Sequence, residues 1–208
     1  MQIGNKILAA AIGAVAVSAI VGLFVQRTVI RAQGIDLTRN TMRGALIEAE
    51  NVRMSFSRLS EGAFDMEKLL REHHASNAPL QESKLYATIP VVAAWNAIDE
   101  LAKSEKYTFR VPKHDARNPK NEPTLHEANI LARFEAGDED YFEIDKANNE
   151  LIYARPIKLT NDCLSCHGDP RTSPTKDGRD LLGFPMEGWK AGEVHAVSYT
   201  HLRAHETL

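Results

Sequence analysis

The sequence predicts an α+β fold in which helices come first and an antiparallel sheet follows. Residues 27–62 contain no proline and are rich in Arg, Glu, Ala and Leu, which is typical of a long amphipathic helix. Residues 141–157 alternate around a polar turn, which is typical of a β-hairpin. The 208-residue chain has a net charge of −3 and scattered basic residues, so we expect no nucleic-acid partner.

The N-terminal segment predicts a membrane span. Ile7 to Val25 carry no charge and a single polar side chain, Ser18, and the run is long enough to cross a hydrocarbon core of about 30 Å. The alternative is a cleaved signal peptide, but the run exceeds the usual length of about 7–15 residues and no Ala-x-Ala site follows it. We therefore expect an uncleaved transmembrane helix over residues 1–27.

The long helix that follows is expected over residues 28–75, together with a short second helix at Met66–His73. Its apolar and small residues recur at heptad spacing, a pattern that suits packing either on its own domain or on a second helix of a homodimer. This heptad seam consists of Ile35, Thr38, Met42, Ala45, Ala49, Val52, Phe56, Leu59 and Ala63.

The remaining elements are read from local signals. A helix is expected over Ser83–Lys106 with a bend at Pro90, then a strand at Tyr107–Val111 and a proline-rich loop. Thr124 and Glu127 have the spacing of a capping box, which predicts a helix to Ala136. The hairpin strands are expected at residues 141–144 and 151–157, and a last strand at 193–197.

The most informative motif is Cys163-Leu-Ser-Cys166-His167, the attachment pattern of covalent c-type haem. Cys163 and Cys166 would form thioethers with one porphyrin, and His167 would be the proximal iron ligand. A zinc site would need a remote fourth ligand, because the chain has only two cysteines. A redox dithiol would ordinarily lie near the start of a βαβ fold, which is not the pattern that precedes residue 163.

Six segments, with the haem motif among them, together carry a resemblance to a known family. They are Ile89-Pro-Val-Val-Ala-Ala-Trp95, Phe109-Arg-Val-Pro-Lys113, Arg117-Asn-Pro-Lys-Asn121, Arg155-Pro-Ile-Lys-Leu-Thr160, Asp162-Cys-Leu-Ser-Cys-His-Gly-Asp-Pro170 and Gly183-Phe-Pro-Met-Glu-Gly-Trp-Lys-Ala-Gly-Glu-Val-His195. In this order they resemble the PAS-like haem c sensor domains of bacterial methyl-accepting chemotaxis proteins and sensor kinases. The resemblance covers about residues 1–196 and implies an antiparallel sheet flanked by helices over residues 76–197, holding one haem c. In full receptors of this kind a second span and cytoplasmic signalling modules follow.

Two expectations concern the surroundings of the haem domain. Basic residues are more frequent after the span than before it, and this count alone would place the domain in the cytoplasm. Covalent haem attachment overrides that count and favours a periplasmic domain on the bacterial inner membrane. Residues 198–208 lose the family pattern and resemble translated adapter sequence, so we expect a non-native and disordered tail.

The sequence offers several candidates for the ligand at the sixth coordination position of the iron. Met54 is the first candidate for the distal ligand, because it lies on the face of the helix opposite the heptad seam. Arg110, Arg155 and Trp189 are candidates for contacts with the haem. The other candidates for the distal ligand are Met186, His73, His74, His114, His126 and His195.

We expect a membrane-anchored sensor in which a redox change, or a small gaseous ligand at the iron, shifts the coordination and moves the long helix. The alternative is a membrane-anchored monohaem electron-transfer cytochrome. Catalysis is not expected, because no distal acid–base pair can be identified.

Overall fold

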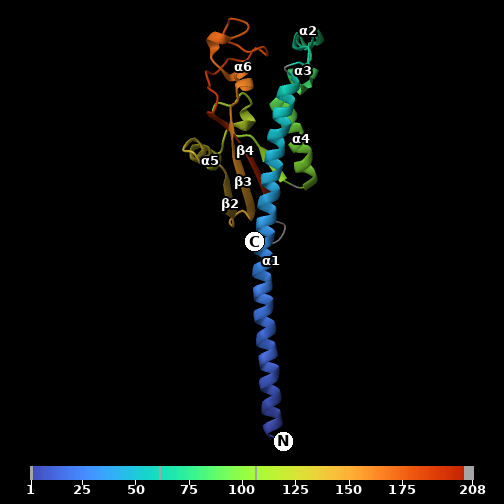
Figure 1. Ribbon diagram of the computed structural model, residues 1–208, viewed down its shortest axis with the longest axis vertical. Helices are drawn as coiled ribbons and strands as arrows, with labels where there is room; N and C mark the ends of the chain where they lie inside the picture. The colour runs from blue at the N-terminus through green and yellow to red at the C-terminus, as the bar shows by residue number, and fades with distance from the viewer. Residues whose placement is uncertain (1, 61, 106, 204–208) are drawn as a thin grey trace. The chain divides into compact units, whose positions relative to one another are not determined.

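The computed structural model describes residues 2–60, 62–105 and 107–203. The chain divides into two units, with the boundary between Thr41 and Met42. Six α-helices in the described residues are α1 (Gln2–Ser60), α2 (Met66–Ser76), α3 (Lys84–Ala87), α4 (Pro90–Glu105), α5 (Leu125–Glu135) and α6 (Leu164–His167). The four strands are β1 (Tyr107–Arg110), β2 (Tyr141–Asp145), β3 (Glu150–Lys158) and β4 (Val194–Arg203) (Figure 1).

The first unit is the N-terminal part of α1. Its side chains are exposed almost throughout, and large apolar residues such as Ile7, Ile20 and Phe24 remain more than half exposed. This helix is long and apolar enough to cross a membrane by length and composition, which a signal sequence would also satisfy.

In the second unit, α1 presents a buried stripe at Met42, Leu46, Ala49, Arg53 and Ser57. These positions recur every three or four residues, as expected for one helix face. Met42 and Ala49 of the heptad seam are therefore buried within their own domain, whereas Leu59 stays half-exposed.

The sheet is antiparallel with the strand order β1-β4-β3-β2. Helix α5 packs against β3 and β4, and the main apolar cluster forms between them (Figure 1). The cluster contains Ile130, Leu131, Phe134, Ile152, Ala154, Val197 and Tyr199. The predicted capping box begins α5, because Thr124 Oγ1 accepts from the Glu127 amide while Glu127 Oε2 accepts from the Thr124 amide. The expected α+β class, with a long apolar N-terminal helix and a flanked antiparallel sheet, is confirmed.

Two expectations about local structure are wrong. Residues 83–106 do not form one bent helix: α3 ends at Ala87 and α4 begins at Pro90. Proline has no N–H to donate and disfavours helical geometry in the residue before it, so it suits the first position of a new helix.

The expected disorder after Val197 is the second correction. Ser198 to Arg203 continue β4, where they pair with β3 on one side, and four of them also pair with β1 on the other. Tyr199 and Thr200 are buried. This part of β4 lies inside the sheet, so its backbone groups find partners that the sequence pattern alone did not indicate. The rest of the predicted tail, residues 204–208, lies outside the described residues.

Candidate functional site

The cysteine motif lies directly after β3, in a short 3-10 turn that leads into α6. Cys163, Cys166 and His167 fall within about one helical turn, so the two sulfurs share one face of the chain. Both cysteines are free thiols and partly buried. Burial, and then the negative charge of Asp180, raise the pKa of the Cys166 thiol, which keeps this sulfur protonated at neutral pH.

Helix α1 reaches the motif through Arg53, which is only 5% exposed. Its Nη1 donates to Asp162 Oδ2 at 3.1 Å and lies 3.6 Å from Cys163 Sγ, while its Nη2 lies 2.8 Å from Glu50 Oε1. The Ser57 hydroxyl donates to the same oxygen of Asp162. Burial alone would raise the pKa of Asp162, but the bond from Ser57 and the charge of Arg53 lower it overall.

A second contact fixes the imidazole of His167. Its Nδ1 lies 2.7 Å from Glu187 Oε2, and the other carboxylate oxygen lies 3.0 Å from Lys113 Nζ and 3.3 Å from Arg117 Nε. Burial would raise the pKa of Glu187, but the bonds to His167 and Lys113 lower it to about 2. The carboxylate is therefore ionised at neutral pH and can only accept hydrogen bonds.

His195 and Trp189 lie beside this imidazole. The rings of His167 and His195 are 4.4 Å apart, and Trp189 meets the His195 ring edge to face at 5.1 Å. Burial, and then the charges of His167 and Lys113, lower the pKa of His195 to about 3, so His195 is neutral near pH 7. One ligand atom each from His167, Glu187 and His195 lies within 4.8 Å of the others. Within the described residues, neither cysteine joins this group, which gives no support to a zinc site built on Cys163 and Cys166.

Arg117 contacts the main chain of the cysteine motif. Its guanidinium donates to the Cys166 carbonyl oxygen at 3.0 Å and to the buried Asp180 carboxylate at 2.8 Å. The same group lies over the Phe184 ring at 5.0 Å. These contacts tie the 180–185 segment to the helical turn that carries the cysteines.

The structure places the other predicted site residues as follows. Arg110 Nε lies 3.0 Å from Glu127 Oε1, and the guanidinium also donates to two carbonyls of the proline-rich loop. Arg155 lies in β3 opposite Ser198 and interacts with the Tyr153 hydroxyl. Met54 is 36% exposed, next to Arg53 on α1. No contact between these three residues and His167 is found in the described structure, and their haem roles stay predictions.

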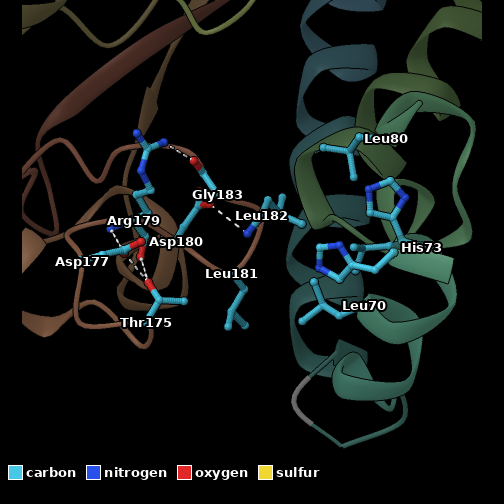
Figure 2. Close-up of a pocket in the computed structure, with 12 residues that line it drawn as sticks. Leu70, His73, Leu80, Thr175, Asp177, Arg179, Asp180, Leu181, Leu182 and Gly183 are labelled. Atoms are coloured by element: carbon cyan, nitrogen blue, oxygen red, sulfur yellow. Dashed lines mark hydrogen bonds between the residues drawn. The ribbon is translucent and has the colours of Figure 1, made fainter. Parts of the chain in front are cut away.

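A cavity of about 180 Å³ lies beside the 175–183 segment. Figure 2 shows His73, Leu70 and Leu80 on one wall, and Asp177, Arg179 and Leu181 on the other. His73, one of the candidates for the distal ligand, lines this cavity with its ring and is partly buried. Local sequence patterns do not indicate the roles of Arg53, Asp162 and Glu187, because the partners of these residues are distant in the sequence.

Comparisons with known proteins support one family. No curated protein matches the sequence. The crystal structure of the cyanobacterial heme-protein Tll0287 matches with a TM-score of 0.57 and 17% identity, over 81% of this chain and 96% of that chain. At this identity the likeness shows a shared fold. The model of the Tll0287-like family matches residues 25–201, and the chain therefore belongs to the Tll0287-like family.

Proposed function

We propose that this protein is a membrane-anchored sensor domain that binds one haem c covalently. The observation that carries the proposal is the arrangement of Cys163, Cys166 and His167, with two free thiols on one turn and an imidazole held by Glu187. Each thiol can add across one vinyl C=C bond of a porphyrin, with the sulfur on one carbon and the hydrogen on the other. The additions therefore need no oxidant.

The donor set fits haem iron. The Glu187 carboxylate is hydrogen-bonded to Nδ1 of His167, which leaves the lone pair of Nε2 for a metal. When bound, the haem would supply an iron that changes its oxidation state and takes up small ligands. The described fold relative is a haem protein, which supports haem binding in this family member. Covalent attachment is inferred from the motif of this chain.

The contact between Arg53 and Asp162 supports a sensor. Cys163, Cys166 and His167 would hold the haem, and Asp162 in the turn just before α6 is bonded to two residues of α1, so a change of charge or coordination at a bound iron would be felt by this helix. Helix α1 also contains the apolar segment Ile7–Val25. We infer that this helix anchors the domain in the bacterial inner membrane, with the haem on the periplasmic side, and carries the signal.

The proposal also includes a signalling pathway and a homodimer. The earlier resemblance suggests a role in chemotaxis or in a sensor kinase, with binding and signalling in place of catalysis. The half-exposed Leu59 and the partly buried Val52 and Phe56 leave a seam on α1 that a second copy of the chain could cover.

Electron transfer is the second candidate. Cys163, Cys166 and His167 are all partly exposed, and electron transfer needs such an accessible haem edge. Hydrogen exchange of oxidised and reduced protein separates the two functions. A sensor should change the protection of residues 50–57 of α1 with redox state, whereas a carrier should keep it constant.

Haem attachment is tested by producing the full chain with a c-type maturation system. Covalent haem should survive denaturing electrophoresis and acid–acetone extraction, and it should be lost in the Cys163→Ala/Cys166→Ala variant. The Ser165→Ala variant changes the residue between the cysteines and should keep the haem. Extraction of all haem from the wild-type protein would contradict the proposal.

A further inference from the structure

The carboxylate of Glu187 is held at both of its oxygens. Oε2 lies 2.7 Å from Nδ1 of His167, while Oε1 lies 3.0 Å from Lys113 Nζ and 3.3 Å from Arg117 Nε. An ionised carboxylate has no proton to donate, so Nδ1 must be the donor in this bond. The tautomer of His167 is thereby set, and Nε2 carries the free lone pair.

The main chain holds Glu187 in register with the motif. The Trp189 amide donates to the His167 carbonyl oxygen at 2.9 Å, and the Gly188 amide donates to the Gly168 carbonyl oxygen at 2.9 Å. Gly168 has no room for a side chain, because a Cβ there would lie 2.4 Å from the Leu164 carbonyl oxygen. Gly188 has a φ of +80°, a conformation that favours glycine. Gly168 thus lets the chain leave the α6 turn, and Gly188 lets it turn directly after Glu187, while the two main-chain bonds hold these segments together.

The site shields these charges from water. The exposed fractions of the side chains are 11% for Lys113, 21% for His167 and 22% for Glu187. Hydrogen bonds between charged groups are stronger where water is largely excluded.

We propose that Glu187 is a positioning residue that holds His167 and increases its electron donation to the iron, with Lys113 moderating that effect. This inference rests on the proposed function. A carboxylate acceptor on Nδ1 gives the imidazole more anionic character, which favours ferric over ferrous iron and lowers the reduction potential. Lys113 withdraws charge from the opposite oxygen and keeps the proton on Nδ1.

The first test uses the haem-loaded full chain with Glu187→Gln, which retains the size of the side chain and removes its charge. We expect a higher reduction potential. We also expect a lower frequency for the Fe–imidazole stretch, recorded by resonance Raman after photolysis of the distal ligand. Glu100→Gln, the same change at an exposed residue of α4, is the matched control and should move neither quantity.

The second test uses Lys113→Met, with the exposed Lys103→Met as its control. Removal of this cation strengthens the bond between Glu187 and His167, so the Fe–imidazole frequency should rise, opposite to its change in Glu187→Gln. A changed potential with an unchanged frequency in both variants would mean that the groups act only by their charge, and it would overturn the positioning role.

The same preparations separate the inference from the function on which it rests. Wild-type protein without covalent haem would refute the proposed function. Wild-type protein with covalent haem, together with a Glu187→Gln variant that matches Glu100→Gln in both measurements, would refute the role of Glu187 alone.

Discussion

Arg53 and Asp162 are 109 positions apart in the sequence, yet their side chains form an ion pair of 3.1 Å at the start of the cysteine motif. Arg53 is almost fully buried, whereas the Asp162 side chain is 26% exposed. Together with the bond from Ser57 to Asp162, this pair joins α1 to the turn that contains Cys163.

Removal of Arg53 should destabilise the domain. Arg53→Met leaves Asp162 without its cation, and we expect a loss of about 2 kcal/mol in the free energy of unfolding, measured by urea denaturation. Arg58→Met, an exposed change on the same helix, should have an effect below about 0.5 kcal/mol. Equal losses in the two variants would show that the buried pair contributes nothing.

Acid should weaken the same contact. The pKa of Asp162 in the folded protein lies below its ordinary value of 3.8, so its contribution to stability is present above that value. It is lost as the pH falls through the lower, folded-state pKa. We expect Asp162→Asn to remove part of the acid-induced decrease in melting temperature below pH 3.8. An unchanged acid profile in the variant would argue against the lowered pKa.

Met54 remains the candidate distal ligand. If its sulfur binds ferrous iron, Met54→Ala should convert a low-spin ferrous spectrum to a high-spin one and open the haem to carbon monoxide. Met66→Ala, at the start of α2, is the control and should keep the wild-type spectrum. A low-spin Met54→Ala variant would exclude this residue, and His73→Ala would then be the next variant to record.

Truncation after Val197 should unfold the domain. It removes the part of β4 that pairs with β1 and the buried residues Tyr199 and Thr200. A chain that ends after Arg203 keeps the strand pairs and should melt well above the chain that ends at Val197. Tyr199→Ala should cost about 3 kcal/mol, measured by thermal unfolding. A chain ending at Val197 with normal stability would show that these strand pairs are dispensable.

Much of the fold could be predicted from local patterns. The capping box at Thr124 and the hairpin at residues 141–157 are local features, and the structure contains both. The end of β4 was missed because polar residues such as Ser198 and Thr200 suggest solvent, while their burial depends on strands far away in the sequence.

The residues of the candidate site also differ in whether their signal is local in the sequence. Cys163, Cys166 and His167 could be proposed from the sequence because a haem attachment motif depends on close spacing alone. Glu187 and Arg53 could not be assigned roles, since each acts on a partner brought close only by folding.

The start of α4 at Pro90 was mistaken for a bend within one helix, because a proline near a helix start is compatible with both patterns.

The position of β4 within the sheet has a consequence for biosynthesis. A ribosome makes β1, β3 and the cysteine motif before it makes β4, which pairs with both of those strands. Until β4 arrives, β1 and β3 cannot be joined in one sheet, and the segment with Cys163 and Cys166 emerges from an unfinished domain. The strand order thus leaves an interval during synthesis in which both thiols belong to a domain whose sheet is still incomplete.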